Sequence, residues 1–142
     1  MSKDAAGAVP TPREGGTSMI WIGRILTGLA TAFFVMDGTM KFIQPQFVID
    51  ATREIGWPTD PATLGVLGFL LLGCTVLYII PPTAVLGAIL LTGYLGGAVA
   101  SHARLGDPLF THDLFGVYMG VFVWGGLWMR DSRVRALIPL SR

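Results

Sequence analysis

An acidic and a basic residue stand four positions apart inside a long apolar stretch, Asp37 and Lys41. On a helix, side chains at this spacing lie on one face, and the order acid then base favours an ion pair. An ionisable residue inside an apolar helix is by default a hypothesis for a functional site. Near a helix end, however, a lysine can extend toward the membrane surface and hold a purely structural pair. The sequence leaves both interpretations open.

A second group of polar residues lies at the facing ends of the last two apolar stretches and between them: Ser101, His102, Arg104, Asp107, His112 and Asp113. Histidine titrates near neutral pH, so with a lysine and an aspartate it can bind or protonate a quinone-like carbonyl. The two histidines lack H-x-x-x-H spacing and a nearby cysteine, so we predict no metal or haem site. We predict instead a ligand-binding polar cluster with no assigned catalytic residue, formed by Asp37, Lys41, His102, Arg104, Asp107 and His112.

Four apolar stretches must position these side chains. Each is close to the roughly 17 to 25 residues that cross about 30 Å of hydrocarbon as a helix. Hydrophobic residues make up 52% of the 142-residue chain and charged residues only 13%, against about 25% charged residues in soluble domains. We therefore predict an all-α, polytopic membrane protein, a bundle of four transmembrane helices over residues 19–43, 61–80, 82–104 and 112–129.

The bundle is expected to cover residues 19–129, between a disordered tail at residues 1–18 and a basic tail at residues 130–142. Of the ten Lys and Arg residues, seven lie before or near the start of the first span or after the fourth. Because basic residues concentrate on the cytoplasmic side, we predict a plasma-membrane protein with both termini in the cytoplasm. This topology brings Asp37 and Lys41 to the same outer end as the second polar group. The formal charge of +1 gives no drive toward nucleic acid.

Residues 45–56 predict a short helix on the outer membrane surface, between the first two spans. Its two faces separate apolar from charged side chains, as in helices that lie at an interface. The apolar face carries Phe47, Val48, Ala51 and Ile55, and the charged face Asp50, Arg53 and Glu54. Trp57, which follows this helix, is explained by anchoring at the interface.

Three segments together are similar to one known family: Asp37-Gly-Thr-Met-Lys41, the run Thr92-Gly-Tyr-Leu-Gly-Gly-Ala-Val-Ala-Ser-His-Ala-Arg-Leu-Gly-Asp-Pro-Leu-Phe110, and the closing Trp-Met-Arg-Asp-Ser-Arg-Val-Arg-Ala-Leu-Ile-Pro-Leu. They resemble the DoxX-like family of small four-helix membrane proteins. Relatives bearing the DoxX and DoxD names are linked to quinone-coupled oxidation of sulfur compounds and to membrane complexes that handle oxidative stress. Other four-helix relatives act as assembly factors. The resemblance implies that the family's polar motifs fall on Asp37, Lys41, His102, Arg104, Asp107 and Pro108.

Two functions from different classes follow. The first is a membrane-embedded binding or redox-complex subunit, whose outer polar cluster contacts a quinone or another small amphiphile and whose electrons pass through a membrane partner. The second is a non-catalytic interaction or assembly factor. For this second function, small residues at four-residue spacing predict faces where helices contact one another or a second copy, namely Gly93, Gly97 and Ser101 in the third span and Gly116 and Gly120 in the fourth. Whether the chain is an enzyme stays open.

Overall fold

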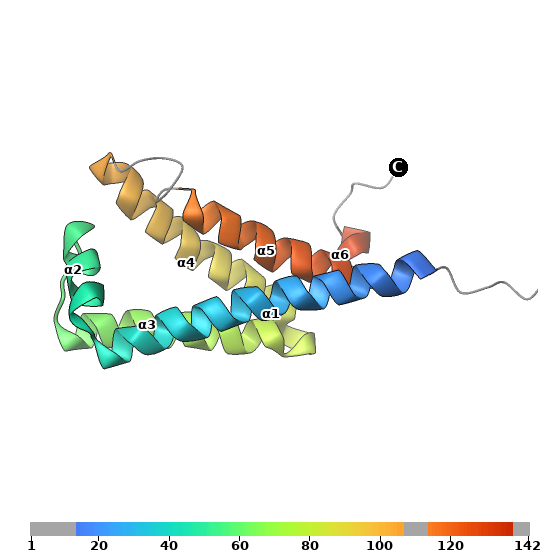
Figure 1. Ribbon diagram of the computed structural model, residues 1–142, viewed down its shortest axis with the longest axis horizontal. Helices are drawn as coiled ribbons and strands as arrows, with labels where there is room; N and C mark the ends of the chain where they lie inside the picture. The colour runs from blue at the N-terminus through green and yellow to red at the C-terminus, as the bar shows by residue number, and fades with distance from the viewer. Residues whose placement is uncertain (1–13, 107–113, 138–142) are drawn as a thin grey trace, which may run out of the picture.

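The computed structural model describes residues 14–106 and 114–137, and every regular element in these ranges is helical (Figure 1). The elements are α1 (Glu14–Ile43), α2 (Gln46–Glu54), α3 (Pro61–Ile79), the short 3₁₀ turn η1 (Pro81–Thr83), α4 (Ala84–Leu105), α5 (Phe115–Arg130) and α6 (Ser132–Leu137). The predicted all-α class is confirmed. The short helix predicted after the first span is present as α2.

Three helical segments are long and apolar enough to cross a membrane: Gly16–Ile43, Pro61–Ile79 and Pro81–Leu105. The expected fourth span is represented by α5, whose 16 residues rise about 24 Å, less than the roughly 30 Å of a hydrocarbon core. The described part of the chain therefore contains three candidate membrane-spanning helices. The four-span bundle is not confirmed.

The four longest helices each pack against two others. Helix α1 packs against α3 and α5, and α4 likewise packs against α3 and α5. Figure 1 shows that the pair α1 and α3 diverges from the pair α4 and α5 toward the end of the molecule where α2 lies. The helices are in contact at the opposite end, near α6, so the arrangement opens at one end only.

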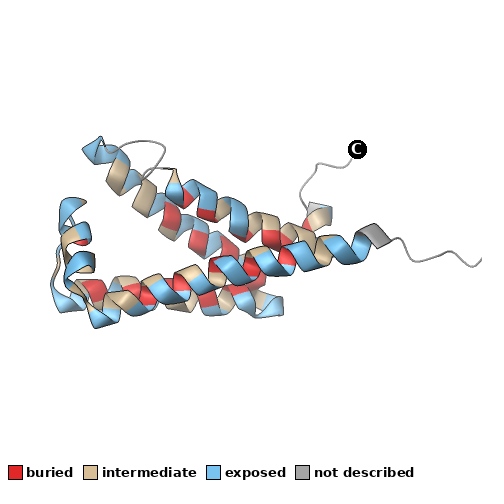
Figure 2. Cartoon of the chain, viewed as in Figure 1, coloured by how far each residue is buried: buried red, intermediate tan, exposed pale blue. Residues whose placement is uncertain are grey.

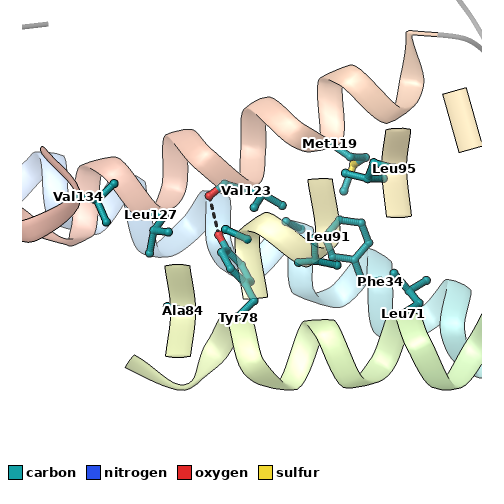
Figure 3. Packing of buried hydrophobic residues seen from close by; sticks show 12 residues of the cluster. Phe34, Leu71, Tyr78, Ala84, Leu91, Leu95, Met119, Val123, Leu127 and Val134 are labelled. Carbon is teal, nitrogen blue, oxygen red and sulfur yellow. Dashed lines mark hydrogen bonds between the residues drawn. The ribbon is translucent and has the colours of Figure 1, made fainter. Parts of the chain in front are cut away.

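The core is centred on Tyr78, whose side chain is fully buried. Its hydroxyl donates a hydrogen bond to the Val123 carbonyl oxygen at 2.9 Å (Figure 3). Helix α4 passes the backbone of Tyr78 very closely, because a Cβ placed on Gly87 would lie 2.2 Å from the Tyr78 nitrogen. Only glycine permits this approach without a shift of the backbone. This end of the structure is therefore tightly packed.

Large apolar side chains cover much of the outer surface of the helices. Phe69 is 71% exposed and Val121 is 64% exposed, and exposed residues follow the outward faces along the helices in Figure 2. Contiguous apolar surface of this extent is rare on soluble monomers and marks contact with a membrane or partner. With the three candidate spans, it indicates that lipid surrounds the helices.

Helix α3 begins where the sequence predicts it. Asp60 is the N-cap residue, and its carboxylate accepts hydrogen bonds from the Thr63 backbone N–H at 3.0 Å and from the Thr63 hydroxyl at 2.6 Å. These bonds, the one from the hydroxyl first, hold the pKa of Asp60 below its usual value. Pro61 occupies the first helical position, where a missing N–H costs nothing.

Candidate functional site

A cavity of about 500 Å³ lies at the end of the structure where the helices diverge. Residues of α1 to α5 and of the segment after α2 contribute to its wall, which is mainly apolar. Six aromatic side chains line it: Phe33, Phe34, Phe47, Trp57, Tyr94 and Phe115. A cavity of this size falls within the range of about 300 to 1,000 Å³ that is usual for small-molecule sites.

The predicted ion pair of α1 lines this cavity. Lys41 Nζ donates to both carboxylate oxygens of Asp37, each at 2.7 Å. The side chains are largely shielded, with Lys41 14% exposed and Asp37 34% exposed. Two opposite charges in contact cancel at long range, so the wall here is polar without carrying a net charge. An ammonium group has three N–H donors. Lys41 Nζ can therefore donate a further hydrogen bond to an oxygen atom of a ligand.

Helix α4 contributes the polar groups of the second cluster. His102 and Ser101 both line the cavity, as do Asp37 and Lys41. The structure thus brings three of the six predicted site residues to one cavity, although His102 is 61 positions from Lys41 in the chain. Asp107 and His112, with the neighbouring Pro108 and Asp113, lie outside the described residues.

Arg104 has a different place from the one predicted for a ligand-binding residue. It does not line the cavity. Its Nη2 donates to the Ile55 carbonyl oxygen at 3.2 Å, so the guanidinium holds the end of α2 against α4. A Cβ placed on Gly56 would lie 2.6 Å from the same Nη2, and Gly56 has a φ of +77°. A side chain there would meet both the arginine and an unfavourable backbone conformation.

Helix α2 covers the cavity with its apolar face. Phe47, Val48, Ala51 and Ile55 all line it, which is the face that the sequence assigns to the membrane surface. Trp57 Nε1 donates to Ser101 Oγ at 3.0 Å, giving a second link between this segment and α4. Anchoring at the membrane interface therefore explains Trp57 only in part, because the Trp57 side chain also closes one side of the cavity.

Two glycines of α4, Gly93 and Gly97, have a role that their spacing does not indicate. Within this chain the predicted helix contact at Gly93 and Gly97 is wrong, because a Cβ at either position would meet nothing within 4 Å. Both glycines line the cavity instead. On α5, a Cβ at Gly116 would lie 2.7 Å from Val99 Cγ2, as expected of a helix contact, whereas a Cβ at the other predicted position, Gly120, would meet nothing within 4 Å. The missing side chains of Gly93 and Gly97 leave the space that the cavity occupies.

Two polar lining residues were not predicted from the sequence, Thr52 on α2 and Tyr94 on α4. Tyr94 stands between Gly93 and Leu95 and lines the cavity with both. The sequence signal for Tyr94 was its neighbours, since Gly93, Gly97 and Ser101 share one helical face at four-residue spacing.

Among the described residues, no group of three or more His, Cys, Asp or Glu side chains is placed to hold a metal ion. The arrangement offers aromatic surfaces for a flat ring and hydrogen-bonding groups at its polar side.

Comparison with known proteins gives one match. The family model described as the DoxX-like family matches residues 25–126, which include every residue that lines the cavity. No curated protein and no solved structure matches the chain.

Proposed function

This chain belongs to the DoxX-like family and is a membrane protein, and from that premise we propose that it binds a small amphiphile of the quinone class. The site is the cavity that residues of α1 to α5 line and that α2 covers. One observation carries the proposal: a mainly apolar, aromatic-lined space of about 500 Å³ has a shielded Lys41–Asp37 pair and His102 in its wall. Ligand sites commonly combine apolar walls with a few polar groups that orient the ligand.

Each part of the wall matches a part of such a ligand. The aromatic rings, Phe33 and Phe115 in edge contact at 5.1 Å between centroids, offer surfaces against which a planar ring can pack. Lys41 Nζ has an N–H that Asp37 does not use, and this N–H can donate a hydrogen bond to a carbonyl oxygen. His102 lines the same cavity from α4, and its imidazole ring offers a further hydrogen-bonding group. Binding and orientation of the polar head are the roles we assign to these residues.

The proposed topology places this cavity at the outer face of the plasma membrane. In this topology α5 is a fourth span, both termini are cytoplasmic and α2 lies outside. The excess of Lys and Arg near the two termini supports it. The chain has a single cysteine, Cys74, so a Cys74→Ser background permits a direct test. A membrane-impermeant maleimide applied to intact cells should label Glu54→Cys, and should label Ser132→Cys only after permeabilisation; the reverse pattern contradicts the topology.

The experiment that tests the ligand class is mass spectrometry of small molecules that co-purify with the protein and its native lipids. We expect a quinone in the parent protein, and its loss in correctly folded Lys41→Met and His102→Ala variants. Arg53→Met is the matched control, because Arg53 is 63% exposed on α2 and does not line the cavity. A partner chain without any small amphiphile, in parent and variants alike, would contradict the proposal and favour an assembly factor.

A further inference from the structure

A second groove lies near the other end of the helices, where α1 packs against α5. A Cβ placed on Gly23 would lie 2.7 Å from Met129 Cβ and 3.0 Å from the Arg130 backbone nitrogen. The helical turns that carry Arg24 and Arg130 are therefore in direct contact. Both line a groove of about 480 Å³, together with Thr27, Gly28, Ala32 and Val35 among others. We call it the Arg24–Arg130 groove.

Neither arginine of this groove forms a salt bridge with any other described residue. Each guanidinium lies over an aromatic ring instead: Arg24 Cζ is 5.3 Å from the centroid of Trp21, and Arg130 Cζ is 5.2 Å from that of Tyr78. Arg130 Nη2 also donates to the Tyr78 carbonyl oxygen at 3.1 Å. Two like charges that line one groove repel each other, and an anion bound there would relieve that repulsion.

Two further polar atoms in the Arg24–Arg130 groove are unsatisfied. Arg130 Nε and Thr31 Oγ1 are buried and have no hydrogen-bond partner within the described part of the chain. A guanidinium has five N–H donors in a planar fork that suits phosphate oxygens. The Arg130 Nε–H and the Thr31 hydroxyl thus keep hydrogen-bonding capacity that the described part of the chain does not use.

Apart from the two arginines and the two threonines, Thr27 and Thr31, the groove is apolar and open to the surroundings of the helices. Gly28, Ala32 and Val35 are exposed, and a Cβ at Gly28 would meet nothing within 4 Å. Together with Arg24 these residues follow one side of α1 over about 16 Å of helix rise. A cationic end followed by a shallow apolar strip matches a molecule with an anionic head and a hydrocarbon chain.

We propose that the Arg24–Arg130 groove binds one anionic phospholipid. Its phosphate lies between the two guanidinium groups, and an acyl chain follows Gly28 and Ala32. Basic pockets between membrane helices commonly bind anionic lipid headgroups in this way. The site shares no residue with the cavity beneath α2, so it stands independently of the function proposed above.

Native mass spectrometry of the full-length protein in a non-ionic detergent tests this site. Phosphatidylglycerol and phosphatidylcholine with the same acyl chains are titrated separately. We expect one tightly bound phosphatidylglycerol and at least about tenfold weaker binding of phosphatidylcholine, given the contribution of each basic residue near a headgroup. Arg24→Gln should weaken phosphatidylglycerol binding about fivefold. Gly28→Leu should also weaken it, although the charge is unchanged, because the side chain fills the apolar strip.

The matched control is Arg133→Gln, which removes the same charge outside the groove. Arg133 is 72% exposed and pairs with Asp131 at 3.0 Å, so its loss should leave phosphatidylglycerol binding within about twofold of the parent. Equal weakening by Arg133→Gln and Arg24→Gln would overturn the site in favour of general surface charge. Equal binding of the two lipids would also overturn it. Displacement of phosphatidylglycerol by inorganic phosphate at similar concentrations would reassign the site to a soluble anion.

Discussion

The Asp37–Lys41 pair gives the sharpest prediction for the wall of the proposed binding cavity. Removal of one partner from a buried pair costs about 3 to 5 kcal/mol, whereas an exposed pair is worth about 0 to 1 kcal/mol. With side chains 34% and 14% exposed, this pair lies between the two limits. We expect Lys41→Met to lower the free energy of unfolding by about 2 kcal/mol, because it leaves the Asp37 carboxylate against an apolar wall.

The companion variant Asp37→Asn should cost less, about 1 kcal/mol, since the flexible lysine can carry its ammonium toward the membrane surface. The double variant should then be less destabilised than the sum of the single variants. The expected coupling energy is at least about 1 kcal/mol, because neither charge remains unpaired once both are removed. The assay is reversible unfolding in mixed micelles, titrated with sodium dodecyl sulfate and followed by circular dichroism.

An exposed pair on α2 is the control for this cycle. Arg53 Nη1 lies 3.1 Å from Asp50 Oδ1, and the two side chains are 63% and 48% exposed. The corresponding cycle should give a coupling energy below about 0.5 kcal/mol. If the Asp37–Lys41 coupling is no larger than that of the α2 pair, the argument from shielding is refuted.

Three further predictions concern the fold. Gly87→Ala should destabilise the protein by more than about 3 kcal/mol, because its Cβ would overlap the backbone of α3, whereas Gly96→Ala on the same helix should be neutral or stabilising; denaturant midpoints of the two variants test this. Tyr78→Phe should cost about 1 kcal/mol through loss of the hydrogen bond to Val123, and a stability equal to that of the parent would contradict it. The lowered pKa of Asp60 means that its stabilising contribution is complete above the unfolded pKa of about 3.9 and disappears as the pH falls through the lower folded value. Asp60→Asn keeps the capping oxygen but should remove this acid-dependent loss, which melting temperatures between pH 6 and pH 2 will measure.

Local features of the structure were predictable from the sequence. The start of α3 depends on Asp60 and Pro61, which are adjacent, and the Asp37–Lys41 contact depends only on helical spacing. In each case residues within one turn determine the outcome. The amphipathic pattern of α2 was readable for the same reason, although the pattern does not say whether lipid or protein meets its apolar face.

Features that depend on distant packing were not predictable. The four-residue spacing of Gly93 and Gly97 defines a face of α4, but whether a helix or an empty space meets that face depends on how far α4 diverges from α1. The bond from Trp57 to Ser101 joins residues 44 positions apart, and the placement of Arg104 on Ile55 is similarly non-local. Composition alone indicates neither contact.

The most direct test of the proposed ligand site is to fill it without changing its charges. Gly97→Leu places a side chain in the cavity, and Gly96→Leu places the same side chain at an adjacent exposed position of α4 that does not line the cavity. A Cβ at either position meets nothing within 4 Å. The measurement is the Kd of a short-chain ubiquinone for the detergent-purified parent and both variants, after circular dichroism has shown equal helix content. We predict that Gly96→Leu binds like the parent and that Gly97→Leu binds at least about tenfold more weakly, because the added side chain excludes the ring from well-packed contact. Equal affinity in all three proteins, or no measurable binding by the parent, would contradict the account.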